Sequence, residues 1–204
     1  MKITYKDKTM EIQEPQKVID VFKKECNEHV IACICNNQIQ SLNHVLKEDT
    51  NIKFIDISDK DGLRIYIRGL SYIMAKAFSE VYPKALLTVD YQLSNSMFFE
   101  IDNMKVTDEM LEAVSNRMNE IVQEDLPITK VIMTKEEADE FYEKNKTLKG
   151  ILQKDIKERD HVTLYYCEDY YNYFYGVMPI STKYMKIFKL EKYKHGFIIR
   201  YPNR

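Results

Sequence analysis

The residues best suited to chemistry in this sequence are two cysteines and two histidines near the amino end. Cys33 and Cys35 lie in the apolar run Val30–Cys35, so on a strand both side chains point to one face. His29 and His44 are the nearest histidines, and two sulfur and two nitrogen ligands would be the inventory of a zinc site. The ligand spacing of known zinc motifs is missing, so we expect buried free thiols and no metal.

Other common catalytic patterns are absent from the sequence. None of the four histidines has a partner at helical spacing, so we assign them no catalytic role. No two of the five glycines lie closer than seven residues apart. This spacing excludes the G-x-x-x-x-G-K-[ST] phosphate loop, the G-x-G-x-x-G dinucleotide turn and the G-x-S-x-G nucleophile elbow. The chain by itself is therefore not a P-loop kinase, a Rossmann-type dehydrogenase or an α/β-hydrolase.

The composition is that of a globular protein with one large or two small domains. The chain has 204 residues, of which 45% are apolar and 30% charged. No apolar run approaches the ~20 residues that span a bilayer, and the first residues do not begin a signal peptide. We therefore expect a cytoplasmic protein that has no membrane partner, and its four cysteines do not indicate a disulfide framework.

The last 22 residues concentrate positive charge. Residues 183–204 hold seven basic side chains and one acidic one, a balance of +6, which leaves -8 of the total -2 for the rest of the chain. Lys183, Lys186 and Lys189 are therefore candidates for contacting an anionic partner, either RNA or an acidic neighbouring domain. A solvated sheet edge that resists pairing explains the same charges equally well.

Nine of the fifteen tyrosines lie between residues 165 and 201, a longer stretch that we call the tail. They could form a stacking platform for bases or nucleosides, because aromatic faces stack on bases at ~1–3 kcal/mol each. The alternative is that tyrosine suits strands, with its ring in the core and its hydroxyl at the rim. The nine are Tyr165, Tyr166, Tyr170, Tyr171, Tyr173, Tyr175, Tyr184, Tyr193 and Tyr201.

The first part of the chain is expected to form a small sheet wrapped around one helix. The polar turn Lys6-Asp7-Lys8 predicts a hairpin, and Asn36-Asn37 predicts a second tight turn. Residues 59–62 break the pattern and form the expected boundary between a domain at 1–62 and a domain at 63–204. The predicted elements are strands at 3–5 and 9–12, a helix at 14–22, and strands at 30–35, 38–40 and 52–57.

The second part mixes helices and strands without βαβ alternation, so the fold class is α+β. Thr107 is a predicted helix cap, and residues 134–137 form a predicted capping box. The predicted elements are helices at 64–82, 107–126, 134–142 and 149–157, and strands at 86–91, 97–101, 128–133, 161–167, 184–190 and 196–201.

Residues 1–62 resemble a TGS domain, the ubiquitin-like β-grasp module at the amino end of threonyl-tRNA synthetases and some GTPases. The small sheet on one helix and the Asn36-Asn37 turn before a short strand carry this resemblance. It implies a β-grasp fold for the first domain.

Two stretches of the second part carry a further resemblance. The helix at 64–82 followed by Leu86–Asp90, and the tail residues Cys167–Thr182 with Ile187–Leu190, are similar to the second additional domain of threonyl- and alanyl-tRNA synthetases. In those enzymes this domain removes mischarged amino acids from tRNA. The resemblance implies an α+β domain with an antiparallel sheet.

The residues that perform editing in that family are replaced in this chain. The family uses a His-x-x-x-His pair on the helix and a Cys-x-x-x-His set in the tail, and the resemblance aligns Arg68 and Tyr72 with the first pair. Phe174 and Met178 stand at the tail cysteine and histidine. Arginine stays protonated, tyrosine titrates near about 10, phenylalanine has no lone pair, and methionine is a weak acceptor. We therefore expect no editing activity and no catalytic residue.

The former editing cleft is a candidate ligand pocket. Arg68 would bind a phosphate or carboxylate there, or else it is a structural arginine paired with Asp90 or Glu100. The other candidates for lining this pocket are Tyr72, Cys167, Phe174, Tyr175 and Met178.

The stretches Phe174–Gly176 and Gly196–Pro202 resemble the amino-terminal half of clostridial-type uridine (nucleoside) kinases more closely than they resemble the synthetases. This resemblance implies a non-catalytic regulatory or substrate-presenting segment, with a P-loop kinase domain in cis beyond Arg204. ATP and Mg would belong only to that domain, and this segment would have no cofactor. The alternative is a stand-alone tRNA- or RNA-binding protein derived from the synthetase editing module.

Overall fold

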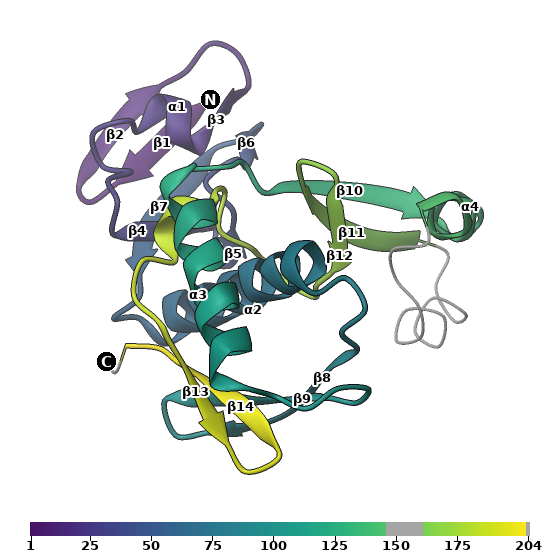
Figure 1. Cartoon of the computed structure of the whole chain (residues 1–204). Coiled ribbons are helices and arrows are strands. Elements are labelled where there is room, and N and C mark those ends of the chain that lie inside the picture. The colour runs from purple at the N-terminus through teal and green to yellow at the C-terminus, as the bar shows by residue number, and fades with distance from the viewer. Residues whose placement is uncertain (146–160, 203–204) are drawn as a thin grey trace. The chain divides into compact units, whose positions relative to one another are not determined.

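The computed structural model describes residues 1–145 and 161–202, and its helices and largely antiparallel sheets form an α+β fold (Figure 1). The predicted helix at 149–157 lies outside the described residues. No helix in the described ranges is long and apolar enough to cross a membrane. The chain divides into two compact units, Met1–Asp125 with Val177–Arg204, and Leu126–Gly176.

The amino-terminal part of the first unit is a five-stranded sheet. Its strands are β1 (Lys2–Tyr5), β2 (Lys8–Glu11), β4 (Val30–Cys35), β5 (Gln38–Gln40) and β7 (Thr50–Asp56). They are ordered β2-β1-β7-β4-β5, with β1 parallel to β7 and the other neighbours antiparallel. The predicted hairpin is confirmed, and so is the Asn36-Asn37 turn, where φ angles of 46° and 66° are ones that asparagine tolerates.

The predicted helix at 14–22 is much shorter in the structure, because its backbone donors are used elsewhere. The Val18 N–H donates to the His44 carbonyl at 2.9 Å. The Ile19 N–H donates to the Leu42 carbonyl at the same distance, so only one helical turn forms. The observed elements are β3 (Gln16–Lys17), α1 (Val18–Val21) and β6 (Val45–Leu46), with β3 paired to β6.

Helix α2 (Lys60–Val81) begins inside the predicted break. Asp59 is its N-cap residue, and a Cβ on Gly62 would lie 1.7 Å from the Asp56 carbonyl oxygen. The glycine is therefore required for a close approach between the end of β7 and the first turn of α2. Residues on both sides of this turn belong to the first unit, and the domain boundary at 59–62 stays a prediction.

A second sheet of the first unit joins the middle of the chain to its tail. Its strands β8 (Leu87–Leu93), β9 (Ser96–Ile101), β13 (Lys189–Tyr193) and β14 (Gly196–Arg200) are ordered β13-β14-β9-β8. Helix α3 (Asp108–Gln123) begins at the predicted cap, where Thr107 accepts the Met110 N–H at 3.2 Å. Phe78 of α2 contacts Phe197 of β14 with ring centroids 5.4 Å apart, so α2 packs on one face of this sheet.

The predicted strand at 184–190 is wrong. Residues Thr182–Tyr184 form a 3₁₀ turn, η1, and β13 starts only at Lys189. The Thr182 hydroxyl donates to the Ile121 carbonyl of α3 at 2.6 Å, and Tyr184 is buried. These contacts hold the segment against a helix instead of beside a strand. Lys183 therefore lies in η1, whereas Lys189 begins β13.

The described residues of the second unit form a three-stranded sheet with one helix. Its elements are β10 (Thr129–Thr134), α4 (Lys135–Asn145), β11 (His161–Cys167) and β12 (Tyr170–Tyr173), with sheet order β10-β11-β12. The predicted capping box is confirmed, because the Thr134 N–H donates to Glu137 at 2.8 Å and the Glu137 N–H donates to Thr134 at 3.2 Å. Ala138, Val162 and Leu164 form a buried core cluster in this unit. The sequence did not predict strand β12.

Candidate functional site

Arg68 lies near the middle of α2, where the sequence predicted a phosphate- or carboxylate-binding group. The side chain is half-buried, and its Nη1 donates a hydrogen bond to the Val177 backbone carbonyl. Glu100, one of its two predicted structural partners, pairs with His195 instead. The side chain of Asp90, the other predicted partner, lies outside the described residues. In this structure Arg68 holds the first residue of the returning tail.

The tail segment 177–187 packs closely on α2. A Cβ on Gly69 would lie 2.7 Å from Cγ of Pro179 and 2.8 Å from Sδ of Met185, so only glycine fits there without movement. Met178, at the position of the family's tail histidine, is 2% exposed. Tyr72, at the position of the second helix histidine, is fully buried. Both side chains belong to the packed core of the first unit.

Two side-chain hydroxyls hold the same segment at other points. Tyr66 of α2 donates to the Ile187 carbonyl at 2.7 Å and accepts the Ile187 N–H at 2.9 Å. Burial raises the pKa of Tyr66 to about 12, so this phenol keeps its proton. Together with the Thr182 contact to α3, these bonds fix the tail without any group that could act on a substrate.

The other three candidates lie in the second unit. Cys167 ends β11 and is fully buried, and Phe174 is half-buried. Tyr175 is 78% exposed. The structure therefore places Arg68, Tyr72 and Met178 in one unit and the remaining three candidates in the other.

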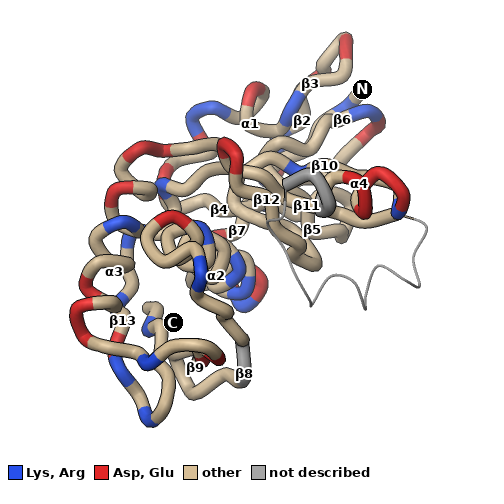
Figure 2. The backbone as a smooth tube through the Cα atoms, turned by 45° about the vertical axis from the view of Figure 1, so that its right-hand side comes forward, with Lys and Arg blue, Asp and Glu red and all other residues tan. Residues whose placement is uncertain are grey.

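The three tail lysines predicted to contact an anionic partner each have a carboxylate neighbour. Lys183 lies 3.0 Å from Asp125, Lys186 lies 2.5 Å from Glu28, and Lys189 lies 2.7 Å from Glu191. These pairs are exposed, with side-chain exposures from 43% to 71% for the lysines. Figure 2 shows basic and acidic stretches interspersed along the chain. The tail therefore presents separate ion pairs and not one basic stripe.

The tail tyrosines do not form one wall. Tyr184 and Tyr201 are buried in the first unit, and Tyr193 contacts Phe98 there. In the second unit Tyr166 and Tyr171 stack with centroids 5.2 Å apart. Three of the nine rings are buried, five are half-buried, and Tyr175 is the one that stands well into solvent among the tail tyrosines that the structure describes.

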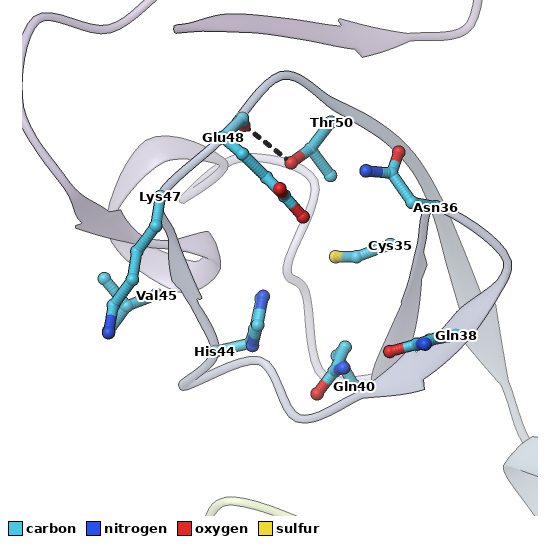
Figure 3. Close-up of a pocket in the computed structure, with 9 residues that line it drawn as sticks. All are labelled: Cys35, Asn36, Gln38, Gln40, His44, Val45, Lys47, Glu48 and Thr50. Carbon is cyan, nitrogen blue, oxygen red and sulfur yellow. Dashed lines mark hydrogen bonds between the residues drawn. The ribbon is translucent and has the colours of Figure 1, made fainter.

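A pocket that the sequence did not predict lies at the edge of the five-stranded sheet (Figure 3). Its volume is about 380 Å³, within the range of small-molecule sites. The Cys35 sulfur, the His44 ring and the Glu48 carboxylate point into the same space. The full lining is Cys35, Asn36, Gln38, Gln40, His44, Val45, Lys47, Glu48 and Thr50.

One wall of the pocket carries the Cys35 thiol, which contacts the buried Cys33 thiol behind it. Cys33 and Cys35 lie on one face of β4 with their sulfurs 3.7 Å apart, as the alternation of the sequence predicted. With Cys33 as donor, this contact lowers the pKa of Cys35, and the same hydrogen bond together with burial raises the pKa of Cys33. Burial and the Lys47 cation lower the pKa of His44, so its imidazole is neutral at neutral pH.

The sequence did hold a signal for this pocket. Cys35 and the two glutamines at 38 and 40 alternate across the Asn36-Asn37 turn, which places them along two paired strands. His44 and Glu48 come from the loop segments before and after β6, and no short spacing in the sequence marks that return. Among the residues that the structure describes, no three His, Cys, Asp or Glu side chains form a metal-binding group.

No protein-family model matches the chain. It is similar to threonine–tRNA ligases, with 27% identity over 196 residues to that of Clostridium kluyveri (strain ATCC 8527) and 28% over 192 residues to that of Chlamydia caviae. The ligase of Clostridioides difficile is 27% identical over 197 residues. These alignments cover 93%, 93% and 94% of this chain, but only 31%, 30% and 31% of the relatives. The chain thus spans about a third of the length of the curated relatives it matches.

The similarity to threonine–tRNA ligases extends over nearly the whole chain. It supports the synthetase resemblance noted in the sequence, at the level of a threonyl-tRNA synthetase-like region. The relatives named above are all ligases, so they give no support to the predicted nucleoside-kinase parent.

Proposed function

We propose that this chain is a tRNA-binding module without editing activity, derived from the amino-terminal region of a threonyl-tRNA synthetase. The observation that carries the proposal is the similarity to threonine–tRNA ligases over 93% of the chain. No other described feature favours a different class of macromolecular ligand. Binding is assigned to the whole module, and hydrolysis is not.

The strand arrangement supports a TGS-like origin for residues 1–62. In the order β2-β1-β7-β4-β5 the first and last strands of the segment are parallel neighbours at the centre. The short α1 and the β3–β6 pair complete the segment. This is the arrangement expected of a ubiquitin-like β-grasp sheet, and we infer that fold for the first domain.

The replaced editing residues support the absence of hydrolysis. Tyr72 and Met178 are buried in the first unit, and the Arg68 guanidinium donates to a backbone carbonyl. An editing site must place a base or a metal beside a water molecule. The side chains at these three positions serve packing and backbone anchoring, so they supply neither group.

The tail lysines remain the best candidates for phosphate contact. Exposed ion pairs contribute only about 0–1 kcal/mol, so a phosphate can displace the carboxylate neighbours of Lys183, Lys186 and Lys189 at little cost.

Fluorescence anisotropy with labelled tRNA at several salt concentrations tests the binding. Affinity should fall steeply as salt rises, and replacing the three tail lysines by alanine should lower the slope of log K against log salt by about 1 per lysine. The equally exposed Lys8, Lys23 and Lys24, replaced together, are the matched control and should change neither quantity. Undetectable or salt-independent binding would remove the tRNA proposal.

A separate assay addresses the lack of editing. The chain is incubated with tRNA^Thr charged with serine, and released amino acid is measured against a reaction without protein. We expect no release above the uncatalysed rate. Release that depends on the chain would leave tRNA binding in place but overturn the non-hydrolytic assignment.

The nucleoside-kinase parent, with its ATP, Mg and cis kinase domain, remains a prediction from the sequence alone. A reading frame that continues beyond Arg204 into a G-x-x-x-x-G-K-[ST] loop would support it. The tRNA affinities expected for the lysine variants are the same whether or not such a domain follows.

A further inference from the structure

The two thiols of β4 are placed for chemistry that tRNA binding does not use. Cys33 and Cys35 are free, are buried, and approach to 3.7 Å. Residues two apart on a strand lie about 6.6 Å apart at Cα, near the upper end of the range that a disulfide spans. A disulfide also needs the two Cβ atoms about 3.8 Å apart, so closing it requires β4 to bend out of its pairing with β5 and β7 around these residues.

Only one of the two thiols reaches the pocket. Cys35 lines it, whereas Cys33 is fully buried and has the Gln40 and Ser41 carbonyls at 3.6 Å and 3.8 Å from its sulfur. A reagent in the pocket thus meets Cys35 first. Cys33 is then the nearest thiol from which a second attack can come.

The pocket lining indicates the kind of reagent. Two side-chain amides, from Gln38 and Gln40, line the side of the pocket opposite the carboxylate of Glu48, and Lys47 lies at the rim (Figure 3). This set offers partners to amide, ammonium and carboxylate groups together. Such groups occur together in zwitterionic, peptide-like molecules, and about 380 Å³ holds a fragment of that size.

We propose that Cys33 and Cys35 form a dithiol site that exchanges with a small zwitterionic disulfide entering the pocket. The site goes beyond the proposed tRNA function and does not depend on it.

The exchange proceeds in two balanced steps. The Cys35 thiol gives its proton to the neutral His44 imidazole, and the resulting thiolate attacks the disulfide R–S–S–R, forming Cys35–S–S–R and releasing one R–S⁻, which takes the proton. Cys33 then loses its proton and attacks the Cys35 sulfur, forming the Cys33–Cys35 disulfide and releasing the second R–SH. The protein loses two electrons and two protons, and the small disulfide is reduced to two thiols.

Incubation of the full chain with oxidised glutathione, followed by intact-mass and peptide mass spectrometry, tests the site. The wild-type chain should lose the mass of two hydrogens, mapped to a Cys33–Cys35 bond. Cys33→Ser should stop at a glutathione adduct on Cys35, because the second thiol is missing. Cys35→Ser should leave Cys33 unmodified, since Cys33 does not reach the pocket.

Cys26 is the internal control. It does not line the pocket, and burial with the charge of Glu25 raises its pKa to about 11, so it should react more slowly than Cys35. His44→Gln should slow the Cys35 reaction several-fold, whereas Asn43→Gln, at an exposed neighbour outside the lining, should not.

Three results would overturn the proposal. They are a first adduct on Cys33 or Cys26, no reaction at Cys35 while a free cysteine peptide reacts, and a reaction that appears only after chelator treatment, which would show a metal on the thiols. Circular dichroism establishes that each serine variant is folded. For any variant that is not, the wild-type rates of alkylation at Cys35 and Cys33, mapped by peptide, give the same discrimination.

Discussion

The former editing positions on α2 and the pocket at the edge of the five-stranded sheet lie in one unit but differ in how their polar groups are used. Arg68 donates to a backbone carbonyl, and Tyr72 is buried in the core. In the pocket, Gln38, Gln40 and Glu48 direct their side chains into open space. The side chains of the first region pack in the core or anchor the backbone, whereas those of the second surround an open volume.

The difference predicts which substitutions should change the stability of the protein and which should not. Substitutions around α2 change close contacts and should change the free energy of unfolding. Substitution of Gln38 or Gln40, whose side chains make no hydrogen bond or ion pair within the described residues, should leave stability nearly unchanged. Three measurements of chemical denaturation compare the two regions directly.

The largest loss of unfolding free energy is expected from Glu80→Gln, near the carboxyl end of α2. Glu80 lies 2.7 Å from Lys76, whose side chain is fully buried, and also pairs with Arg117 of α3. Removing the carboxylate charge beside a buried ammonium should lower the free energy of unfolding by about 3 kcal/mol. Glu120→Gln, which breaks an exposed pair with the same arginine, is the control and should cost less than about 1 kcal/mol.

The same carboxylate makes stability depend on pH. Burial alone would raise the pKa of Glu80, but hydrogen bonds from Lys76 and Arg117 outweigh it and lower the pKa below its ordinary value. The stabilisation is present above the unfolded-state pKa and is lost as pH falls through the lower folded-state pKa. The wild-type chain should therefore lose more stability on acidification than Glu80→Gln, and equal losses would contradict this assignment.

A smaller effect is expected from Gly69→Ala. Helix propensity alone would favour alanine by about 1 kcal/mol. The added Cβ would meet Pro179 and Met185 at less than 3 Å, so overpacking should win and lower stability by about 1–2 kcal/mol. Ser71→Ala, two residues along α2, should be neutral or slightly stabilising. A Gly69→Ala chain as stable as wild type would show that the tail is loosely packed.

The smallest effect is expected in the pocket. Gln38→Ala and Gln40→Ala should each change the unfolding free energy by less than about 0.5 kcal/mol, because neither side chain makes a hydrogen bond or an ion pair with the residues that the structure describes. A loss comparable to that of Gly69→Ala would mean that the pocket side chains hold the sheet, and the contrast between the two regions would disappear.

Local signals in the sequence predicted most of the fold. The caps at Thr107 and Thr134 and the Asn36-Asn37 turn are formed by neighbouring residues, so the sequence alone specifies them. The strand predicted at 184–190 failed because a bond to Ile121 decides its conformation, and that partner lies 61 residues away. The helix predicted at 14–22 failed for the same reason, because the N–H groups of Val18 and Ile19 donate to carbonyls of a later loop.

The candidate sites were less predictable than the fold. Resemblance named Arg68, Tyr72 and Met178, and the structure brings these three into one unit, but residue types could not show how deeply Tyr72 and Met178 are buried. The shared face of Cys33 and Cys35 was predictable from strand alternation. The pocket beside them was not, because its far wall comes from a loop whose path depends on the whole sheet.

The first unit is assembled from two separated stretches of chain, and this affects the order in which the protein can fold. Strand β14 lies between β13 and β9, so an inner strand of the second sheet comes from the last residues. On the ribosome, Phe98 and Phe99 must wait for Phe197, about a hundred residues later, before their sheet can close. The second unit is one continuous stretch of chain between these two. All of its residues are therefore synthesised before Val177–Arg204, the stretch that completes the first unit. During synthesis the smaller unit can be complete while the larger one still exposes its aromatic core.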